Sequence, residues 1–333
     1  MQAGLVLRYN YPERPKKGEN MRYRKIGKTE LEVSSICLGS WVFGGDCWGE
    51  VRDDQSVKVV REAIDRGVNF IDTAPIYGSG RSEKVIGRAI KGRRGDVVIA
   101  TKTGLEQKGS SIRPNLSAGF IRQEIEGSLG RLGLDTIDLY QCHWPDPNTP
   151  LEETFRELIR QRDKGRIRYI GVSNFDKEIL ERALGILPVV SDQVQYSLFS
   201  RDIEKKLLPF CSEKGISILT YGSLGGGILT GKYHSSTSFP KGDVRSFFYK
   251  YYSEPFWQKA GPVLSVLSQI AEKRKVAVPE VAINWVLSHD EVASCIVGCR
   301  NKKQLEQNIK AADWQLQAEE IELIEGEYQK VFV

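Results

Sequence analysis

The sequence has no long apolar run, no closely paired cysteines and no long block of one charge. No run approaches the ~20 apolar residues that a membrane-spanning helix needs, so no membrane span is expected. The 6 cysteines form no CxxC pair and accompany no histidine-rich motif, which predicts reduced thiols in a cytoplasmic protein and no metal site. The 48 lysines and arginines are interspersed with 43 acidic residues, so we expect no nucleic-acid partner.

The first 20 residues differ from the rest of the chain. They include Tyr-Pro-Glu-Arg-Pro-Lys-Lys and have no long apolar segment, so they are not expected to act as a signal peptide. Regular hydrophobic patterning begins at Met21. We therefore interpret residues 1–20 as either a flexible, disordered tail or an upstream start, and we predict one domain over residues 21–333, a length that a large α/β barrel accommodates.

Eight short runs of strand-forming residues recur along this domain, separated by helical patterns. Their apolar character is nearly continuous, as expected for parallel strands that are covered on both faces. The runs are Ser35–Leu38, Asn69–Asp72, Val97–Lys102, Ile137–His143, Ile167–Val172, Val189–Gln195, Ile216–Tyr221 and Ala293–Val297. This repeated alternation predicts a (β/α)₈ TIM barrel.

Local signals place other elements around the barrel. Helices are expected to begin near Asp53, Ser117 and Pro150, and at a cap within Asn174–Asp176. A hairpin over Met21–Ile36, turning at Gly27-Lys28, would plug the N-terminal end of the barrel, and an extra C-terminal helix covers Ala318–Val331. The stretch Gly222–Phe256 has no clear pattern, which is typical of a lid or a ligand-binding loop.

Four chemically distinct side chains fall at or just after three successive strands. Asp72, Lys102 and His143 end their runs, and Tyr77 lies in the loop after the first run. Because active sites in such barrels lie at the C-terminal strand ends, we expect the four to share one rim. Each one alone is more often a structural residue. Together, an acid, a phenol, an amine and an imidazole can deliver a proton to a carbonyl oxygen.

Tyr77 would be the proton donor of this set. A tyrosine has an ordinary pKa of about 10, and the ammonium of Lys102 is expected to lower that pKa by stabilising the phenolate. Asp72 would hold the ammonium in place, and His143 would hydrogen-bond the same substrate oxygen. Such a site suits carbonyl reduction, and because no side chain supplies hydride, a nicotinamide or a flavin is required.

Signals for binding that cofactor are weaker. No GxGxxG motif occurs, so a Rossmann site is not supported. Residues 226–233 nearly match a phosphate-binding P-loop, but Tyr233 stands where a magnesium-binding hydroxyl is required. The segment is therefore either a flexible loop or a phosphate contact. Arg300 lies just before the helix that is expected to follow the last strand. Barrel enzymes often bind phosphate at the start of that helix.

Several stretches match one family, and together they span nearly the whole chain. They are Asp72–Gly78 with Ser82-Glu83, Thr101-Lys102, Arg131–Asp138, Gly165–Phe175 and Gln193–Tyr196. Through them the chain closely resembles the aldo-keto reductases, especially the bacterial general-stress and inositol-associated branch. The resemblance implies a (β/α)₈ fold and a cofactor bound without a Rossmann domain. NADP(H) is the expected cofactor, with NAD(H) as the second option.

The resemblance also assigns roles by position. Tyr77 becomes the general acid/base, modulated by Lys102 and Asp72, and His143 orients the carbonyl. The implied cofactor residues are Asp72, Gly39, Ser40, Trp41, Ser173, Asn174, Gln193, Tyr221, Gly222, Leu224, Gly226, Gly231, Lys232, Gly298, Arg300, Gln304, Gln307 and Asn308. Arg300 would face the 2′-phosphate, together with Lys302 or Lys303. From the residues alone, Ser173-Asn174 would instead be a helix cap.

The substrate side is expected to be aromatic. The implied substrate contacts are Trp41, Tyr77, His143 and Trp144, and further rings available for the pocket are Trp48, Phe247, Phe248, Tyr249, Tyr251 and Tyr252. The leading hypothesis is a cytoplasmic NADPH-dependent reductase of small aldehydes and ketones, acting as a monomer or small homo-oligomer. Two alternatives are a Schiff-base aldolase that uses Lys102 and a non-catalytic, cofactor-sensing subunit.

Overall fold

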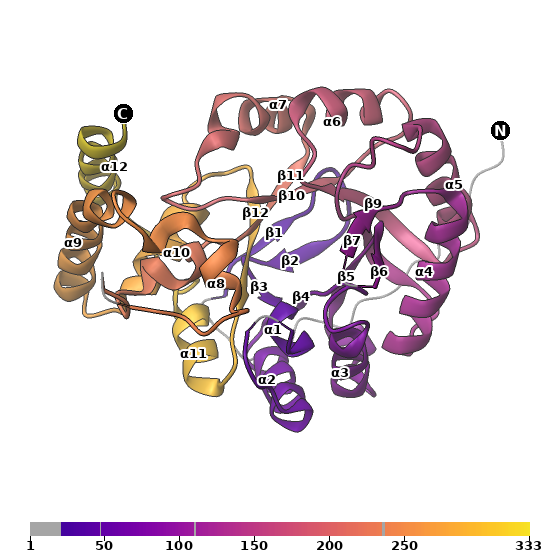
Figure 1. Cartoon of the computed structure of the whole chain (residues 1–333), viewed down its shortest axis with the longest axis horizontal. Helices are drawn as coiled ribbons and strands as arrows, with labels where there is room; N and C mark the ends of the chain where they lie inside the picture. The colour runs from indigo at the N-terminus through magenta and orange to yellow at the C-terminus, as the bar shows by residue number, and fades with distance from the viewer. Residues whose placement is uncertain (1–20, 47, 110, 235–236) are drawn as a thin grey trace.

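A closed barrel of eight parallel strands forms the centre of the protein, as predicted (Figure 1). The computed structural model describes residues 21–46, 48–109, 111–234 and 237–333, so the predicted tail over residues 1–20 lies outside the described residues. The strands follow the order β10-β11-β12-β3-β4-β5-β8-β9 around the barrel. They are β3 (Ile36–Gly39), β4 (Phe70–Asp72), β5 (Val98–Thr103), β8 (Ile137–Cys142), β9 (Ile167–Ser173), β10 (Ser191–Gln195), β11 (Ser217–Tyr221) and β12 (Val292–Gly298).

Helices surround the barrel and alternate with its strands (Figure 1). They are α2 (Asp53–Asp65), α3 (Arg81–Ile90), α4 (Ala118–Leu132), α5 (Leu151–Asp163), α6 (Lys177–Leu184), α7 (Leu207–Lys214), α9 (Phe256–Arg274), α10 (Val278–Leu287) and α11 (Lys302–Lys310). The predicted extra C-terminal helix is α12 (Ala318–Phe332), which packs against α9. Among the described residues, no helix is both long and apolar enough to span a membrane.

The predicted N-terminal hairpin is also present and plugs the bottom of the barrel. Its strands are β1 (Tyr23–Lys25) and β2 (Glu32–Ser34). Ile26, Leu31 and Val33 are fully buried in the cluster that fills the barrel interior. The turn requires Gly27, which has a φ of +53° and a backbone so close to Val190 that a Cβ atom would lie 2.7 Å from its carbonyl oxygen.

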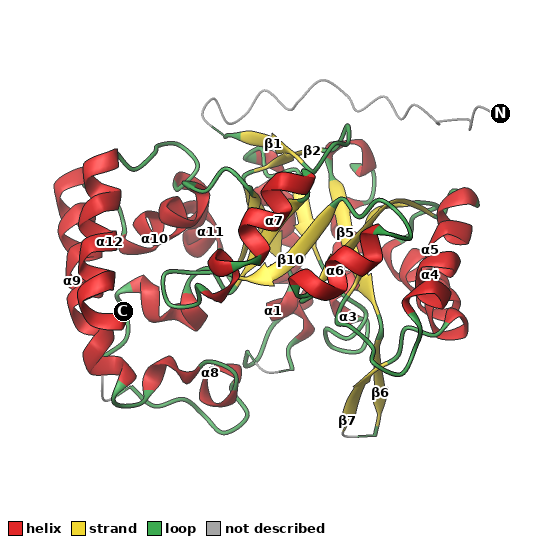
Figure 2. Ribbon diagram, turned by 90° about the horizontal axis from the view of Figure 1, so that it is seen from above, coloured by secondary structure: helices red, strands yellow, loops and turns green. Residues whose placement is uncertain are grey.

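Two insertions at the opposite end of the barrel were not predicted. A second hairpin, β6 (Leu105–Lys108) with β7 (Ser111–Pro114), projects from the barrel between β5 and α4 (Figure 2). A short helix, α1 (Trp41–Gly44), follows β3. The stretch predicted to be unpatterned, Gly222–Phe256, contains the short helix α8 (Val244–Phe247) and 3₁₀ turns at Gly225–Thr230 and Lys250–Tyr252.

One buried carboxyl group lies in the barrel wall, where burial raises its pKa more than the nearby Phe175 backbone N–H lowers it. Asp192 on β10 is paired in register with Val172 and Ile218, whose side chains lie in the apolar layer between strands and helices. Asp192 is fully buried, and neither of its carboxyl oxygens has a hydrogen-bond partner among the described residues. Burial therefore raises the pKa of Asp192 well above its ordinary value.

We predict that Asp192→Asn is more stable than the wild type at pH 8. The folded carboxyl group keeps its proton to a higher pH than the unfolded one, so wild-type stability falls as the pH rises above the unfolded pKa of about 4. Urea unfolding at pH 5 and pH 8 should show an advantage for the variant that grows with pH, by about 1–3 kcal/mol. Asp163→Asn, an exposed change at the end of α5, is the control, and equal pH dependence in all three proteins would contradict the prediction.

Candidate active site

The strand register brings the predicted catalytic residues to one rim. Asp72 ends β4 and is paired with Gly39 of β3 and with Ala100 of β5, two residues before Lys102. His143 directly follows β8, and its backbone N–H donates to the Thr103 carbonyl at 2.8 Å. Parallel strands place their carboxyl ends at the same side of the barrel, so the four predicted side chains come together as expected.

Lys102 is the most deeply buried charge of this rim, with no exposed side-chain surface. Its Nζ donates to Asp72 Oδ1 at 2.6 Å, to the Thr73 carbonyl at 3.0 Å and to the Tyr77 hydroxyl at 3.3 Å. An ammonium has three donors and no acceptor. All three donors are therefore used, and the Tyr77 oxygen accepts one of them while its own O–H proton remains available to a ligand.

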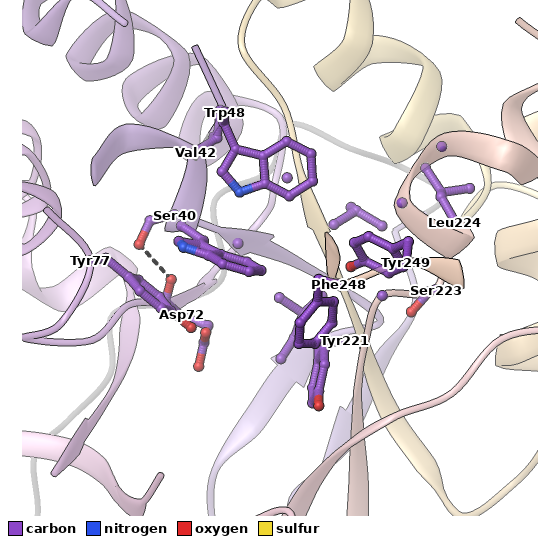
Figure 3. Close-up of a pocket in the computed structure, with 18 of the residues that line it drawn as sticks. Ser40, Val42, Trp48, Asp72, Tyr77, Tyr221, Ser223, Leu224, Phe248 and Tyr249 are labelled. Carbon is purple, nitrogen blue, oxygen red and sulfur yellow. Dashed lines mark hydrogen bonds between the residues drawn. The ribbon is translucent and has the colours of Figure 1, made fainter. Parts of the chain in front are cut away.

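Asp72 connects this group to the rest of the barrel interior. Its second carboxylate oxygen accepts from Gln193 Nε2 at 2.8 Å and from Gln141 Nε2 at 3.5 Å. The Ser40 hydroxyl donates to the Asp72 backbone carbonyl at 2.7 Å (Figure 3). Gln141 was not predicted, because a glutamine inside an apolar strand gives no sequence signal for a second contact to Asp72.

The prediction that Tyr77 has a lowered pKa is wrong. Burial raises the pKa of Tyr77, and the nearby Lys102 ammonium opposes this effect but does not outweigh it. For Lys102, burial alone favours the neutral amine, but Asp72 and Tyr77 together raise its pKa above the ordinary value. Both groups therefore hold their protons at neutral pH.

His143 completes the catalytic rim. Its ring centroid lies 5.9 Å from that of Tyr77, with the two rings nearly perpendicular. Burial lowers the pKa of His143 well below its usual value, and the positive charge of Lys102 acts in the same direction. The imidazole is therefore neutral and can donate one hydrogen bond without adding a charge to the site.

A cavity of about 820 Å³ opens above this rim and contains most of the predicted cofactor residues. The predicted residues that line it are Gly39, Ser40, Trp41, Asp72, Ser173, Asn174, Gln193, Tyr221, Gly222, Leu224, Gly226, Lys232, Gly298, Arg300, Gln304, Gln307 and Asn308. Gly231 does not line it; it ends the Gly225–Thr230 turn in a left-handed conformation. Lys302 and Lys303 do not line it either, and Lys302 pairs with Glu62 at 3.2 Å.

The end of the cavity beside Tyr77 presents hydroxyl and amide groups. The Tyr221 hydroxyl donates to Asn174 Oδ1 at 2.8 Å, and Asn174 Nδ2 donates to the Ser173 hydroxyl and to the His143 carbonyl, both at 3.0 Å. Ser173 lies within β9, and the cap of α6 is Asp176, which accepts from the Ile179 N–H at 2.8 Å. The helix-cap interpretation of Ser173-Asn174 is therefore wrong.

Three cations also line the cavity, on loops that follow β11 and β12: Lys232, Arg245 and Arg300. The Arg300 backbone N–H donates to Gln304 Oε1 at 2.8 Å, at the start of α11. Arg245 pairs with the buried Asp243 at 2.6 Å. Arg245 was not predicted, because it lies in the stretch without a pattern. Three cations, together with the amide groups and the phenol ring near Tyr77, fit the phosphates and the nicotinamide of an extended dinucleotide.

Aromatic side chains form much of the cavity lining, among them Trp48, Tyr77 and Phe248 (Figure 3). The Trp41 ring stacks on Tyr77 at 5.9 Å and meets Trp48 and Phe248 edge-on at 5.6 Å and 6.0 Å. Of the predicted aromatic set, Trp144, Phe247 and Tyr249 also line the cavity, whereas Tyr251 and Tyr252 do not. The β6–β7 hairpin contributes lining residues that were missed, because its short polar strands resemble a loop: Leu105, Gln107 and Ile112.

Acidic and sulfur-containing groups do not gather elsewhere into a metal centre. In the described ranges, no three His, Cys, Asp or Glu residues are placed to hold an ion together. The five cysteines that the structure describes are all buried and unpaired: Cys37, Cys142, Cys211, Cys295 and Cys299.

Comparison with known proteins agrees with this geometry. Residues 35–328 match the model of the Aldo/keto reductase family. Aldo-keto reductase YhdN of Bacillus subtilis is 38% identical over 303 residues, covering 90% of this chain and 91% of that protein. A probable voltage-gated potassium channel subunit beta of Arabidopsis thaliana is 33% identical, covering 88% and 92%.

The fold comparison points the same way. The structure of the glycerol dehydrogenase AKR11B4 from Gluconobacter oxydans superposes with a TM-score of 0.87 at 36% identity, covering 93% of this chain and 96% of that one. Sequence and fold therefore agree over nearly the whole described chain. The protein belongs to the aldo/keto reductase family of NAD(P)H-dependent oxidoreductases.

Proposed function

We propose that the protein catalyses the NADPH-dependent reduction of aldehydes and ketones to alcohols, with Tyr77 as the proton donor. One observation carries the proposal. Lys102 Nζ donates to Asp72, to the Thr73 carbonyl and to Tyr77, which leaves the Tyr77 O–H proton free beside the cavity. A phenol held in this way is a positioned acid for an oxygen that gains negative charge.

The chain's own residues divide the work between orientation and proton transfer. The substrate oxygen accepts a hydrogen bond from Tyr77 and one from the neutral His143. As negative charge develops on that oxygen, the Tyr77 proton moves to it, and the adjacent Lys102 ammonium stabilises the phenolate that remains. Asp72 acts through Lys102: it keeps the ammonium within 3.3 Å of the phenol oxygen.

The cofactor, when bound, supplies the hydride that no side chain can provide. Ser173, Asn174 and Tyr221 would hold its nicotinamide end. Lys232, Arg245 and Arg300 would meet its phosphates. Arg300 is the cation at the start of α11, where paired guanidinium donors suit a phosphate dianion, and this supports a preference for NADPH over NADH.

Neither of the two alternative functions explains the geometry of the site as well as carbonyl reduction does. A Schiff-base aldolase needs a neutral, accessible amine, whereas Lys102 is fully buried and its pKa is raised, against the burial effect, by Asp72 and Tyr77. A non-catalytic subunit is the second alternative, since one relative is a probable channel subunit. The complete arrangement of Asp72, Tyr77, Lys102 and His143 around an open cavity favours catalysis.

We predict that Tyr77→Phe lowers kcat for carbonyl reduction by about two to four orders of magnitude, because the positioned acid is lost. NADPH absorbance at saturating aldehyde measures the rate, and fluorescence titration of NADPH should show nearly unchanged binding. Tyr169→Phe is the matched control, since that tyrosine lies on β9 and outside the cavity. Turnover of Tyr77→Phe at the wild-type rate would remove Tyr77 from this role.

Lys102→Met should move the pH profile of the reverse reaction, alcohol oxidation, to higher pH. That direction requires the Tyr77 phenolate, so its rate rises as the pH passes through the pKa of Tyr77. The Lys102 ammonium lowers this pKa, and its removal raises it. Circular dichroism confirms that the variant is folded. A variant with the wild-type profile would show that Lys102 does not act on Tyr77.

Arg300→Ala is expected to weaken NADPH binding by about 10- to 150-fold, because a charge-assisted contact to the 2′-phosphate is lost. NADH lacks that phosphate, so its dissociation constant should change little. Lys303→Ala is the control, because Lys303 is an exposed cation in the first turn of α11, three residues after Arg300, and does not line the cavity. Equal weakening of both cofactors in Arg300→Ala would exclude Arg300 as the source of selectivity.

A further inference from the structure

The exposed apolar side chains of this protein are concentrated at the mouth of the cavity. Six large apolar residues of the described chain stand out as exposed, and four of them line the cavity: Ile112, Trp144, Phe247 and Phe248. Ile112 is 55% exposed and Phe247 is 60% exposed. An apolar patch that remains open to water around a cavity marks a surface that a ligand covers.

These four residues come from three separate segments. Ile112 lies on the β6–β7 hairpin, Trp144 follows β8, and Phe247 and Phe248 follow β11. Phe248 contacts Trp41, and Trp41 stacks on Tyr77. An aromatic wall therefore continues from the rim down to the phenol that would donate the proton, and a substrate whose carbonyl reaches Tyr77 lies along it.

The charges that line the cavity come from different loops. The three cations Lys232, Arg245 and Arg300 are on the loops that follow β11 and β12, and Arg300 Nη1 would lie 3.9 Å from a Cβ atom at Gly49, in the loop that follows α1. At the catalytic end, Asp72 is neutralised by Lys102 at 2.6 Å. No other Lys or Arg in the described ranges lines the cavity. Among the described residues from Gly39 to Trp144, which include the catalytic rim, the cavity lining therefore carries no Lys or Arg that could pair with a substrate carboxylate.

Asp46 is the carboxylate that remains at the catalytic end. It is exposed, it lines the cavity, and its Oδ2 accepts from the backbone N–H of Gly78 at 2.6 Å. Gly78 directly follows Tyr77, so this negative charge is fixed beside the proposed proton donor. Arg81 lies close to the neighbouring Gly45, but its guanidinium is engaged by Asp53 and by the Val51 carbonyl.

The cations of the β6–β7 hairpin do not neutralise the charge of Asp46. Lys108 pairs with Glu106 at 3.3 Å, and neither Lys108 nor Arg113 lines the cavity. Within the described part of the chain, no ion pair involves Asp46, so its charge is free to act on a ligand.

We propose that the enzyme selects uncharged carbonyl compounds with an apolar body, and that Asp46 discriminates against substrates that carry a carboxylate. This inference rests on the proposed reductase function. Because Asp46 is exposed and its field is screened by water and salt, we expect the discrimination due to Asp46 to be about three- to tenfold in kcat/KM at low ionic strength.

The test compares two substrates of nearly equal shape: methyl 4-formylbenzoate and 4-carboxybenzaldehyde, of which only the second is charged. Both are assayed with NADPH in the wild type, in Asp46→Asn and in Glu50→Gln. Asn can still accept the Gly78 hydrogen bond, so Asp46→Asn removes the charge and keeps the loop contact. Glu50 is an exposed acid of the same loop that does not line the cavity.

The quantity measured is the ester-to-acid ratio of kcat/KM, which cancels any general loss of activity. The wild type should favour the ester by at least about tenfold in low salt, because the apolar wall and Asp46 both disfavour the acid. Asp46→Asn should lower the ratio by about three- to tenfold. Glu50→Gln should leave the ratio unchanged, and 0.5 M NaCl should reduce it in the wild type.

Several results would overturn the inference. An acid reduced as well as the ester by the wild type would refute the charge selection, and equal shifts in Asp46→Asn and Glu50→Gln would refute the role of Asp46. Glyceraldehyde, which is uncharged but hydrophilic, tests the apolar body: it should have a kcat/KM at least about tenfold below that of the ester. If no carbonyl compound is reduced, the proposed function fails, and this inference fails with it.

Discussion

The buried ion pair between Lys102 and Asp72 is the interaction on which the rest of the site depends. Burying an ammonium costs several kcal/mol unless its donors are all satisfied and a counter-charge lies close. Here the Asp72 carboxylate, 2.6 Å from Lys102 Nζ, is the counter-charge and accepts one hydrogen bond. The Thr73 carbonyl at 3.0 Å and the Tyr77 hydroxyl oxygen accept the other two. The phenol is therefore held by the group that also stabilises its negative form.

The buried carboxylate of Asp72 also requires hydrogen-bond donors, and these come from other strands of the barrel. The second carboxylate oxygen of Asp72 accepts from Gln193 and, more weakly, from Gln141, so strands β4, β5, β8 and β10 contribute to one polar network. Gln193 was predicted to contact a cofactor. It lines the cavity, and its Nε2 donates to Asp72, so the carboxylate of the ion pair also fixes the orientation of the Gln193 side chain.

The barrel alone does not determine activity. Proteins with this fold and similar sequence include one named as an aldo-keto reductase and one named as a probable channel subunit. What distinguishes an enzyme is the site that is built on the fold. In this protein the cavity lining combines the three cations Lys232, Arg245 and Arg300 with an aromatic wall of Trp41, Trp48 and Phe248 that extends from Tyr77.

The sequence by itself determined the barrel and the catalytic rim. Continuous apolar runs at regular intervals specify parallel strands, and the end of a strand is a position that sequence reveals, so Asp72, Lys102 and His143 could be placed correctly. The lengths of the patterned segments and the turn signals between them were sufficient to predict the N-terminal hairpin and α12. These features depend on local patterns and on periodicity, which one sequence contains in full.

Only the tertiary structure decided the electrostatics and the far end of the cavity. The pKa of Tyr77 depends on how much burial opposes Lys102, and burial is a property of the packed molecule. Arg245 and the β6–β7 hairpin reach the cavity from segments without a clear pattern, whereas Lys302, adjacent in sequence to a predicted site, turns to Glu62. Which of several nearby cations faces a cavity follows from the path of a loop in space, and local sequence does not encode that path.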